Sequence, residues 1–525
     1  MNATTTRVTS RDAARLTPAP PPGLLEDSPV FPIAAKRELA NSQLRNNLAR
    51  ATETIRTKRA IRVAEVPRWE DLRTAAEAIK NATLRHLDDY LLQAEANLIK
   101  AGAHVHWARD AAQADQIVVD LVKASGVDEI VKVKSMVTQE IEMNEALEAA
   151  GVAAWETDLA ELIVQLGHDR PSHVLVPAIH RNRAEIRDIF VEEMGRYGTP
   201  APDGLTDDPA ELTAAARQHL RDKFLRARTS TSGGNFLVAD TGTLVVVESE
   251  GNGRMCVTLP DTLISVVGIE KVVPTFEDLE VFMQLLPRSS TGERMNPYTS
   301  MWTGVTPGDG PQNVHVVLVD NGRTKALADP IGRQALRCIR CSACMNVCPI
   351  YGHVGGHAYG SVYPGPIGII LTPQLRGMSA PVDRSLPYAS TLCGACVDVC
   401  PVKINFPEVI VHLRHKAADL KKADRRPHME TLVMGVVGWL FGRESRYTWV
   451  TTASGLVGRV LKAGLDGRQK FFGWLPWPAT RWSQARDLPI PASQPFRRQW
   501  KKRSSSPGRT PEGLSSHDRD TEVRP

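Results

Sequence analysis

Seven of the eight cysteines of this chain lie between positions 338 and 400, in two runs of matching spacing. The first run reads C-x2-C-x2-C-x3-C-P and consists of Cys338, Cys341, Cys344 and Cys348. The second run has the same spacing, with a serine in its first position, and consists of Ser390, Cys393, Cys396 and Cys400. Chains that use disulfides for stability spread their cysteines through a small secreted domain. Such clustering within 525 residues indicates a metal site instead.

The spacing of both runs is typical of bacterial ferredoxins that hold two [4Fe–4S] clusters. Two-residue gaps let one tight loop place three thiolates around a cubane, while the next cysteine begins a helix that points to the other cluster. Crossed ligation therefore predicts cluster 1 on Cys338, Cys341, Cys344 and Cys400, and cluster 2 on Cys348, Cys393 and Cys396. Structural zinc also takes four cysteines, but it does not explain seven ligands in ferredoxin order.

The fourth ligand of cluster 2 is missing from the pattern. Ser390 would ligate through oxygen, the cluster would be [3Fe–4S], or a fourth iron would face solvent or a partner. We favour a simple electron relay with a substituted or remote ligand. His353 and His357 are candidates for a remote ligand, although a structural role is the more common one. Cys256, the remaining cysteine, lies in the strand-like segment RMCVTLP and is expected to be a buried core residue.

Basic residues next to the cysteines suit redox work. Arg337, Arg340 and Lys403 would raise the reduction potential of an anionic cluster if they face it, and otherwise they are ordinary solvated charges. Over the whole chain the net charge of +5 is too small and scattered to indicate nucleic-acid binding. The sequence shows neither the roughly 20 apolar residues of a membrane helix nor a secretory signal. We therefore expect a cytoplasmic protein.

Hydropathy patterns predict an α/β fold ahead of the cysteines. HVHWA, EIVKVKS, AAWETD and HVLVPAI are predicted as short strands, and helical segments alternate with them. That rhythm favours a largely parallel sheet covered by helices. NFLVADTGTLVVVE is predicted as a hairpin that turns at Asp240–Gly242, and NVHVVLVDNG closes the region with a further strand.

Composition divides the chain into five predicted parts. A mobile arm and a polar helix are expected in residues 1–66, and the α/β domain in 67–324. An α-helical ferredoxin-like domain follows in 325–415, a C-terminal helical region in 416–500, and a disordered tail in 501–525. The C-terminal region contains TLVMGVVGWLF, which is too short to span a bilayer. A packed helix is the favoured interpretation, and an interfacial segment or a helix for a partner groove is the alternative.

The α/β domain offers candidates for an anion site of its own. Lys132 and Lys134 alternate along a predicted strand and so share a face, and Glu140 follows them. The segments Asp240-Thr241-Gly242 and Gly251-Asn252-Gly253-Arg254 would present backbone donors to an anion. Ordinary turn chemistry explains both segments equally well. No nucleophile arrangement and no G-x-G-x-x-G dinucleotide motif stands out.

Three longer segments make the chain resemble the lactate utilisation protein B family. They are GGNFLVADTGTLVVVESEGNGRM, CIRCSACMNVCPIYGHVGGHAYGSVYPGPIGIILTP and LPYASTLCGACVDVCPVKI, and VKVKSMVTQEIEMNEAL adds to them. The resemblance extends over about residues 60–460, and Ser390 belongs to the family's own pattern. It implies an α/β domain similar to sugar-phosphate isomerase and CoA-transferase folds.

The resemblance also implies a function. The chain would be the iron–sulfur electron-transfer subunit of a complex with two other lactate-utilisation proteins, oxidising L-lactate to pyruvate so that lactate serves as a carbon source. A separate hypothesis concerns the acceptor: if the electrons finally reach a membrane quinone, we expect loose attachment of the protein to the inner face of the cell membrane. One alternative is an iron–sulfur oxidoreductase like heterodisulfide reductase or glycolate oxidase, with its own substrate site. Another is a metabolite-binding module whose clusters report redox state.

Overall fold

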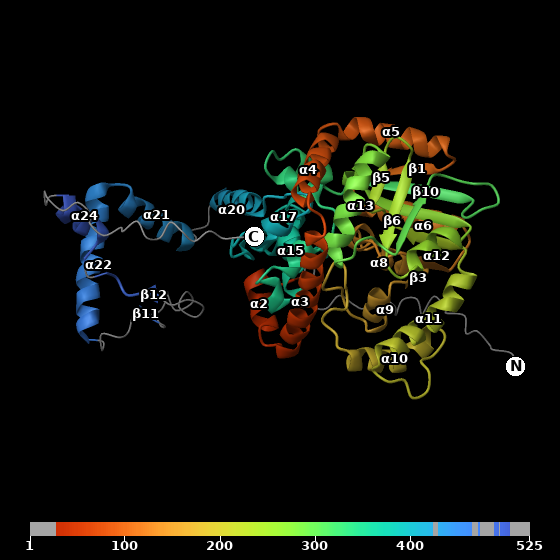
Figure 1. The fold of residues 1–525 in the computed structure, drawn as a ribbon, viewed down its shortest axis with the longest axis horizontal. Coiled ribbons are helices and arrows are strands. Elements are labelled where there is room, and N and C mark those ends of the chain that lie inside the picture. Colours follow the sequence, from red (N-terminus) through yellow and green to blue (C-terminus); the bar gives the residue numbers. More distant parts are fainter. Residues whose placement is uncertain (1–27, 424–428, 465–470, 473–487, 493, 505–525) are drawn as a thin grey trace. The chain divides into compact units, whose positions relative to one another are not determined.

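The structure, a computed structural model, describes residues 28–423, 429–464, 471–472, 488–492 and 494–504. The expected N-terminal arm up to residue 27 and the expected tail from residue 505 lie outside the described residues. The chain divides into two compact units, residues 1–418 and 419–525. The α/β region and both cysteine runs therefore belong to one unit (Figure 1).

A six-stranded parallel sheet forms the centre of the first unit, as the alternating pattern predicts. Its strands, in spatial order, are β1 (His104–Ala108), β10 (Asn313–Val319), β7 (Thr262–Gly268), β4 (Thr229–Ser232), β2 (Glu129–Lys132) and β3 (Ala153–Glu156). Every residue of β7 is buried, because helices cover both faces of a parallel sheet and leave no polar side. All carboxyl ends of these strands lie along one edge of the sheet.

A second, four-stranded sheet contains the predicted hairpin. Its strands, in spatial order, are β8 (Val272–Val273), β5 (Phe236–Val238), β6 (Thr243–Glu248) and β9 (Tyr298–Trp302). β5 and β6 pair antiparallel with Phe236 opposite Val245, which confirms the hairpin. Gly242 turns it with φ +70°, and a Cβ there would meet the backbone nitrogen of Leu98 at 2.7 Å. Only glycine suits both demands.

Helices cover the sheets and connect the strands. In the α/β part they are α4 (Trp69–Arg85), α5 (Leu87–Lys100), α6 (Ala111–Ala124), α7 (Met136–Glu140), α8 (Met143–Ala149), α9 (Leu159–Leu166), α10 (Arg183–Tyr197), α11 (Pro209–Arg226), α12 (Asn252–Thr258), α13 (Phe276–Ser290) and the 3₁₀ turn η2 (Ile269–Lys271). On α6, Ala114, Val118 and Val122 are buried at intervals of four residues and pack with Val317 of β10. That spacing places them on one helix face.

Two local predictions are wrong. HVLVPAI forms no strand, because residues 173–179 run as a loop in which the His173 ring nitrogen Nδ1 accepts hydrogen bonds from the backbone of Leu175 and Val176, at 3.1 and 3.0 Å. Cys256 is buried as expected, but it lies in helix α12 and not in a strand. Apolar runs of this length fit a helix, a strand or a packed loop equally well.

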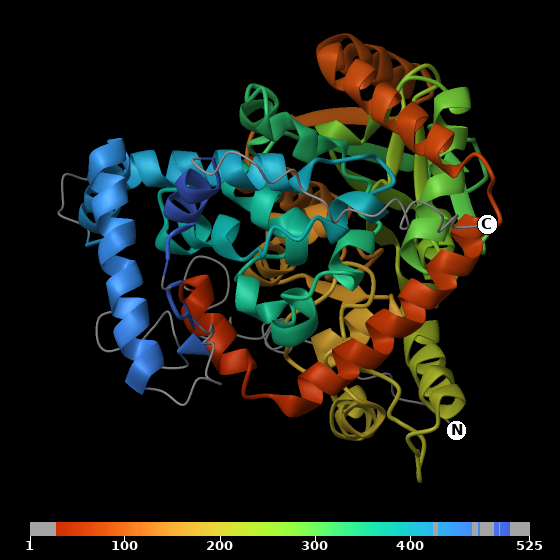
Figure 2. The same ribbon diagram turned by 60° about the vertical axis from the view of Figure 1, so that its left-hand side comes forward.

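The cysteine region consists of short helical elements. They are α14 (Arg323–Leu327), η3 (Gly332–Arg337), α15 (Ala343–Asn346), α16 (Tyr351–Val354), η4 (His357–Tyr359), α17 (Gly365–Leu375), α18 (Pro381–Ser385), η5 (Leu386–Tyr388), α19 (Ala395–Val399) and α20 (Phe406–Ala423). Two N-terminal helices, α2 (Phe31–Glu38) and α3 (Ser42–Ala64), pack onto them. Figure 2 shows the long α3 running beside α15 and α16. One apolar core joins Leu48 of α3, Val316 of β10, Met345 and Phe406.

The second unit is described in part. It contains α21 (Met429–Phe441), α22 (Glu444–Gly464), α24 (Phe496–Ser504) and the short pair β11 (Phe471–Phe472) and β12 (Leu488–Pro489). TLVMGVVGWLF lies in α21, as a helix was favoured there, and Leu432, Met434 and Trp439 on it are exposed. Within the described ranges, no helix combines the length and the apolar character needed to cross a bilayer.

Candidate metal centre

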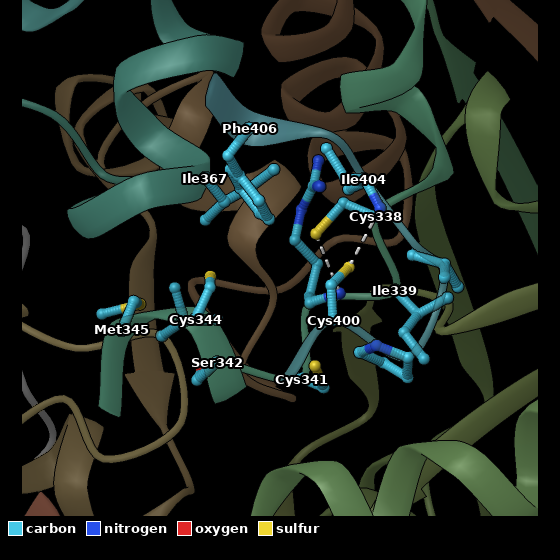
Figure 3. A pocket seen from close by; sticks show the side chains of 14 residues that line it. Cys338, Ile339, Cys341, Ser342, Cys344, Met345, Ile367, Cys400, Ile404 and Phe406 are labelled. Carbon is cyan, nitrogen blue, oxygen red and sulfur yellow. Dashed lines mark hydrogen bonds between the residues drawn. The ribbon is translucent and has the colours of Figure 1, made fainter. Parts of the chain in front are cut away.

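Four cysteines from both runs surround one cavity, called cavity 1. They are Cys338, Cys341, Cys344 and Cys400. The cavity contains about 400 Å³ of space, and Val174, Ile367 and Phe406 contribute apolar walls. In Figure 3 the four sulfur atoms point toward one shared space. This set is the one that crossed ligation predicts for cluster 1.

The backbone conformation orients these cysteine side chains toward the cavity. Arg340 and Ser342 adopt left-handed conformations with φ of +62° and +63°, which fold the C-x2-C-x2-C segment into a tight loop. The backbone N–H of Arg340 donates to Cys338 Sγ at 3.4 Å, and that of Ile404 donates to Cys400 Sγ at 3.4 Å. Amide donors on sulfur are one of the means by which proteins tune iron–sulfur clusters.

The residues around cavity 1 fit an anionic iron–sulfur cluster. Burial raises the pKa of Cys400 to about 11, and burial together with neighbouring cysteines raises the pKa of Cys344 still further. Thiolates are therefore costly here unless a cation compensates them, and iron is such a cation. Within the described part of the chain, Arg340 Nε and Nη1 and Ser342 Oγ are buried without a hydrogen-bond partner. Cluster sulfur would supply acceptors for these donors.

A second cavity, called cavity 2, gathers the other predicted set. Its walls include Cys348, Cys393, Cys396 and Ser390, and it contains about 360 Å³ of space. The backbone N–H of Tyr351 donates to Cys348 Sγ at 3.5 Å. Ser390 Oγ accepts a hydrogen bond from the backbone of Leu392 at 3.1 Å, so its oxygen is held beside the cavity. Iron ligation by the two sets stays a prediction, but the structure brings each set together.

The two cavities differ in exposure. Cys393 is exposed, and α19, which carries Cys396, has no buried residue. Hydrogen bonds from Thr391 and the backbone of Ala395 lower the pKa of Cys393, whereas burial raises the pKa of Cys396 to about 12. Cys341, Cys344 and Cys400 of cavity 1 are all buried. Cys338 is the one cysteine of cavity 1 that is partly exposed, so the cysteines of cavity 2 are the more exposed set of the two.

The three flanking cations have different surroundings. Arg340 lines cavity 1 with its side chain buried. Arg337 instead pairs with Glu77 and donates to Gln334. Lys403 donates to Thr74 Oγ1 at 2.9 Å. Of the three, Arg340 is the residue placed to act on a cluster.

The candidate remote histidines do not line either cavity. His353 Nδ1 bonds to the backbone oxygen of Pro349 at 2.7 Å. His357 Nε2 bonds to the backbone oxygen of Arg170 at 2.8 Å, and its ring packs edge-on against His180. His180 in turn bonds to Asp169 at 2.8 Å. The contacts of His357 join the α/β part to the cysteine region, and that of His353 stays within the cysteine region, so both histidines have structural partners.

Both lysines of the predicted pair in the α/β domain already have partners within the protein. Lys132 is buried and pairs with Glu156 at 2.7 Å. Lys134 donates to the backbone oxygen of Leu175 at 2.9 Å and lies 3.5 Å from Asp158. The carboxylates neutralise both lysines, so these residues do not form an open anion site.

Glu140 and the glycine-rich segments have similar internal partners. Glu140 accepts two hydrogen bonds from Arg323, at 2.8 and 2.9 Å. Gly251 is the N-cap residue of helix α12, and the backbone N–H groups of Gly251 and Arg254 donate to the carboxylate of Glu248, at 2.6 and 3.3 Å. The segment at Asp240 is the hairpin turn. At these positions ordinary turn and capping chemistry is the interpretation that fits.

Sequence reasoning missed several residues near cavity 1. Helix α4 buries Arg73 and Lys80, and Arg73 Nε donates to the backbone oxygen of Cys400 at 2.9 Å. Both lie on the same helix face as buried Ala76. Basic residues at positions where helical spacing predicts buried apolar ones could have indicated them from the sequence. Val174 also lines cavity 1, although it belongs to the loop that was predicted as a strand. Nothing in its local sequence indicates that contact.

Comparisons with known proteins agree with this arrangement. Residues 91–319 match the family model of the LUD domain, and residues 334–404 match that of the 4Fe-4S dicluster domain. The second match covers both cysteine runs and supports an iron–sulfur cofactor. A solved structure of a DUF162 family protein from Deinococcus radiodurans aligns with a TM-score of 0.25 and 16% identity, over 44% of this chain and 98% of that chain. So low a score carries no weight for the fold.

Curated relatives extend the similarity to most of the chain. Lactate utilization protein B of Bacillus licheniformis is 42% identical over 463 residues, which cover 87% of this chain and 94% of that protein. Lactate utilization protein B of Shouchella clausii is 40% identical over 483 residues, which cover 91% and 98%. The relatives thus match from end to end, through both the LUD domain and the cysteine runs. The chain therefore belongs to the lactate utilization protein B family.

Proposed function

We propose that this protein is the iron–sulfur electron-transfer subunit of a system that oxidises L-lactate to pyruvate. The observation that carries the proposal is the sorting of seven cysteines into two cavities, in the crossed order of a two-cluster ferredoxin. The names of the relatives supply the substrate. Each cluster, when bound, accepts and donates one electron. Oxidation of lactate to pyruvate releases two electrons and two protons.

The proposed cofactors are two [4Fe–4S] clusters, one in each cavity. Four cysteines would hold the first, and Cys348, Cys393 and Cys396 would hold the second. Ser390 Oγ lies at cavity 2, where it would serve as the fourth ligand. If Ser390 is not a ligand, the alternatives for cavity 2 are a [3Fe–4S] cluster and a [4Fe–4S] cluster whose fourth iron faces solvent. An iron count identifies the [3Fe–4S] alternative, because about eight irons indicate two cubanes and about seven indicate one cubane with one [3Fe–4S] cluster; a Ser390→Ala variant separates ligation by Ser390 from a solvent-facing fourth iron.

Partners would meet the protein at cavity 2. Electron transfer needs a cofactor near the surface, and Cys393 and Leu392 are exposed there, whereas three of the four cysteines at cavity 1 are buried. We propose two other lactate-utilisation proteins as those partners, and a membrane quinone as the final acceptor. The exposed apolar residues Leu432 and Trp439 of α21 support contact of the second unit with the inner face of the membrane. Failure of the protein to sediment with vesicles at low salt, with its partners present, would count against that contact.

The central test uses anaerobically purified protein and a single cysteine variant. Cys341→Ala should lower the iron and sulfide content by about one cluster and abolish lactate-dependent electron flow in the assembled system. Cys256→Ala is the matched control, because Cys256 is buried but lies at neither cavity. Iron content and electron flow should stay unchanged in the control. Full activity of Cys341→Ala, or zinc in place of iron, would refute the proposal. Lactate turnover by the isolated chain would favour a complete oxidoreductase instead.

A further inference from the structure

Buried basic residues from parts of the chain far apart in sequence gather at one side of cavity 1. Arg340 lines the cavity, Lys80 comes from helix α4, and Lys271 ends the 3₁₀ turn η2 after strand β7. Their exposed fractions are 9%, 2% and 8%. Lys80 Nζ donates to the backbone oxygen of Glu270 at 2.6 Å, the Glu270 carboxylate accepts from Arg340, and Lys271 is the next residue along the chain, so the three basic residues lie together. Two of them belong to the α/β part and not to the ferredoxin-like part.

The carboxylates nearby do not balance this charge. Glu270 is the carboxylate that contacts the group, accepting from Arg340 Nη2 at 3.3 Å. Arg323 also donates to Glu270, at 2.5 Å, and to Glu140. Although burial alone would raise it, the surrounding cations bring the pKa of Glu270 down to about 2, so this carboxylate is ionised. Two carboxylates thus face two arginines and two lysines. Burial lowers the pKa of Lys80 to about 8 and that of Lys271 to about 7, so positive charge exceeds negative charge beside the cavity when these lysines are protonated.

Two further cations, from helices α4 and α3, contact the backbone at the end of the second cysteine run. Arg73 Nε donates to the backbone oxygen of Cys400, and Arg59 Nη2 donates to that of Val399, both at 2.9 Å. Arg59 is coupled electrostatically to Cys341. By contrast, the described residues that line cavity 2 include no lysine or arginine. Beside cavity 2, Arg414 Nη2 donates to the backbone oxygen of Ser390 at 3.0 Å, so the two centres differ in that a basic side chain lines cavity 1 and no described one lines cavity 2.

Buried charge of one sign is unstable unless an anion faces it. A [4Fe–4S] core with four thiolates is anionic, and one further electron makes it more so. Positive charge nearby stabilises the reduced form and raises the reduction potential, whereas burial without charge would lower it. The unpartnered Arg340 Nε and Nη1 are also available as donors to cluster sulfur.

We propose that the positive charges of Arg340, Lys80 and Lys271 raise the reduction potential of the cluster in cavity 1. Two of these residues belong to the α/β domain, which thereby influences how electrons distribute between the two clusters. The inference rests on the proposed function, since it needs a cluster at cavity 1. The electron moves reversibly, one at a time, between the cluster and a redox partner. No bond to any of these three side chains forms or breaks.

Redox titration of the full chain, followed by electron paramagnetic resonance with dithionite as reductant, tests the proposal. Arg340→Gln removes the charge, and Arg340→Lys keeps it in the same left-handed backbone position. The Gln variant should make reduction of the cavity 1 cluster at least tenfold less favourable, which is about 59 mV for one electron. The Lys variant should recover most of that loss, and the cavity 2 cluster should keep its potential in both. Repeating the titration in a Cys393→Ala background identifies which signal belongs to cavity 1.

Two further variants keep the test decisive. Lys271→Met should shift the same signal in the same direction, and it replaces Arg340→Gln if that variant assembles only one cluster. Lys223→Met is the matched control, because Lys223 is also buried, but its charged neighbours are Arg226, Glu129 and Asp222 and include no cysteine. Assembled clusters with unchanged potentials in Arg340→Gln and Lys271→Met would overturn the inference and leave the proposed function standing. A wild-type chain without iron would overturn both.

Discussion

Glu161 lies on α9 with its carboxyl group buried near the ion pair of Lys132 and Glu156. Gln139 Nε2 donates to Glu161 Oε1 at 2.7 Å. Burial, together with the nearby charge of Glu156, raises the pKa of Glu161 from 4.5 to about 8, even though Lys134 acts in the opposite direction. At the residue scale, this carboxyl group therefore makes the α/β domain sensitive to pH.

We expect Glu161→Gln to remove that sensitivity. The folded state keeps the proton up to a pH of about 8, while the unfolded chain releases it near 4.5. The stabilisation is thus full below pH 4.5 and is lost as the pH rises to 8. Since tenfold in proton affinity is about 1.4 kcal/mol, the stability of the variant relative to wild type should rise by a few kcal/mol across this window.

Thermal unfolding midpoints at a series of pH values, measured by circular dichroism under anaerobic conditions, check this expectation. Glu280→Gln is the matched control, because Glu280 is an exposed residue on the middle of α13. A constant difference between Glu161→Gln and wild type at every pH would contradict the assignment.

Helix α10 shows how an element obtains its boundary from local chemistry. Asn182 caps it, with its side chain accepting from the backbone of Glu185 at 2.9 Å, and the Glu185 carboxylate accepts from the backbone of Asn182 at 2.8 Å. This capping box satisfies donors that the first helical turn leaves free. The loop of residues 173–179, shortly before this helix, has no capping sequence that would mark it. Its conformation depends on contacts with the cysteine region, such as that of Val174 at cavity 1.

Asn182→Ala should lower the free energy of unfolding by about 1 kcal/mol, the usual value of an N-cap side chain. Glu192→Ala on the same helix removes an exposed side chain and no cap, so it should change stability far less. Chemical denaturation curves of both variants against wild type supply the measurement. Equal denaturation midpoints for Asn182→Ala and Glu192→Ala would show that the capping box contributes little to the free energy of unfolding.

At the scale of the whole molecule, one apolar core serves both the α/β part and the cysteine region. Phe282 and Val316 belong to the same core as Met345 and Phe406. Hydrogen bonds cross the same boundary, such as the one from the Tyr351 hydroxyl to the backbone oxygen of Ser172 at 2.9 Å. The second unit, from residue 419, is separate from this core in the division of the chain.

Truncation should therefore give different results at two positions. A chain that ends after Ala423 should keep its iron content and both cluster signals, because it retains the whole first unit. A chain that ends after Thr324 should aggregate or unfold, because it exposes the shared core. Size-exclusion chromatography with iron analysis distinguishes the two. A soluble, folded protein from the shorter chain would show that the α/β domain is independent.

The sequence by itself determined the cysteine order, the alternation of strands and helices, the hairpin at Gly242 and the family. These features are local, since backbone periodicity, turn residues and ligand spacing are written within short segments. Only the tertiary structure decided that Lys80, Lys271 and Arg340 gather beside one cavity. It also decided that the Glu248 carboxylate accepts a hydrogen bond from the backbone of Gly251. The three basic residues come from segments between 69 and 260 residues apart, and packing, which no local pattern encodes, sets the distances between them.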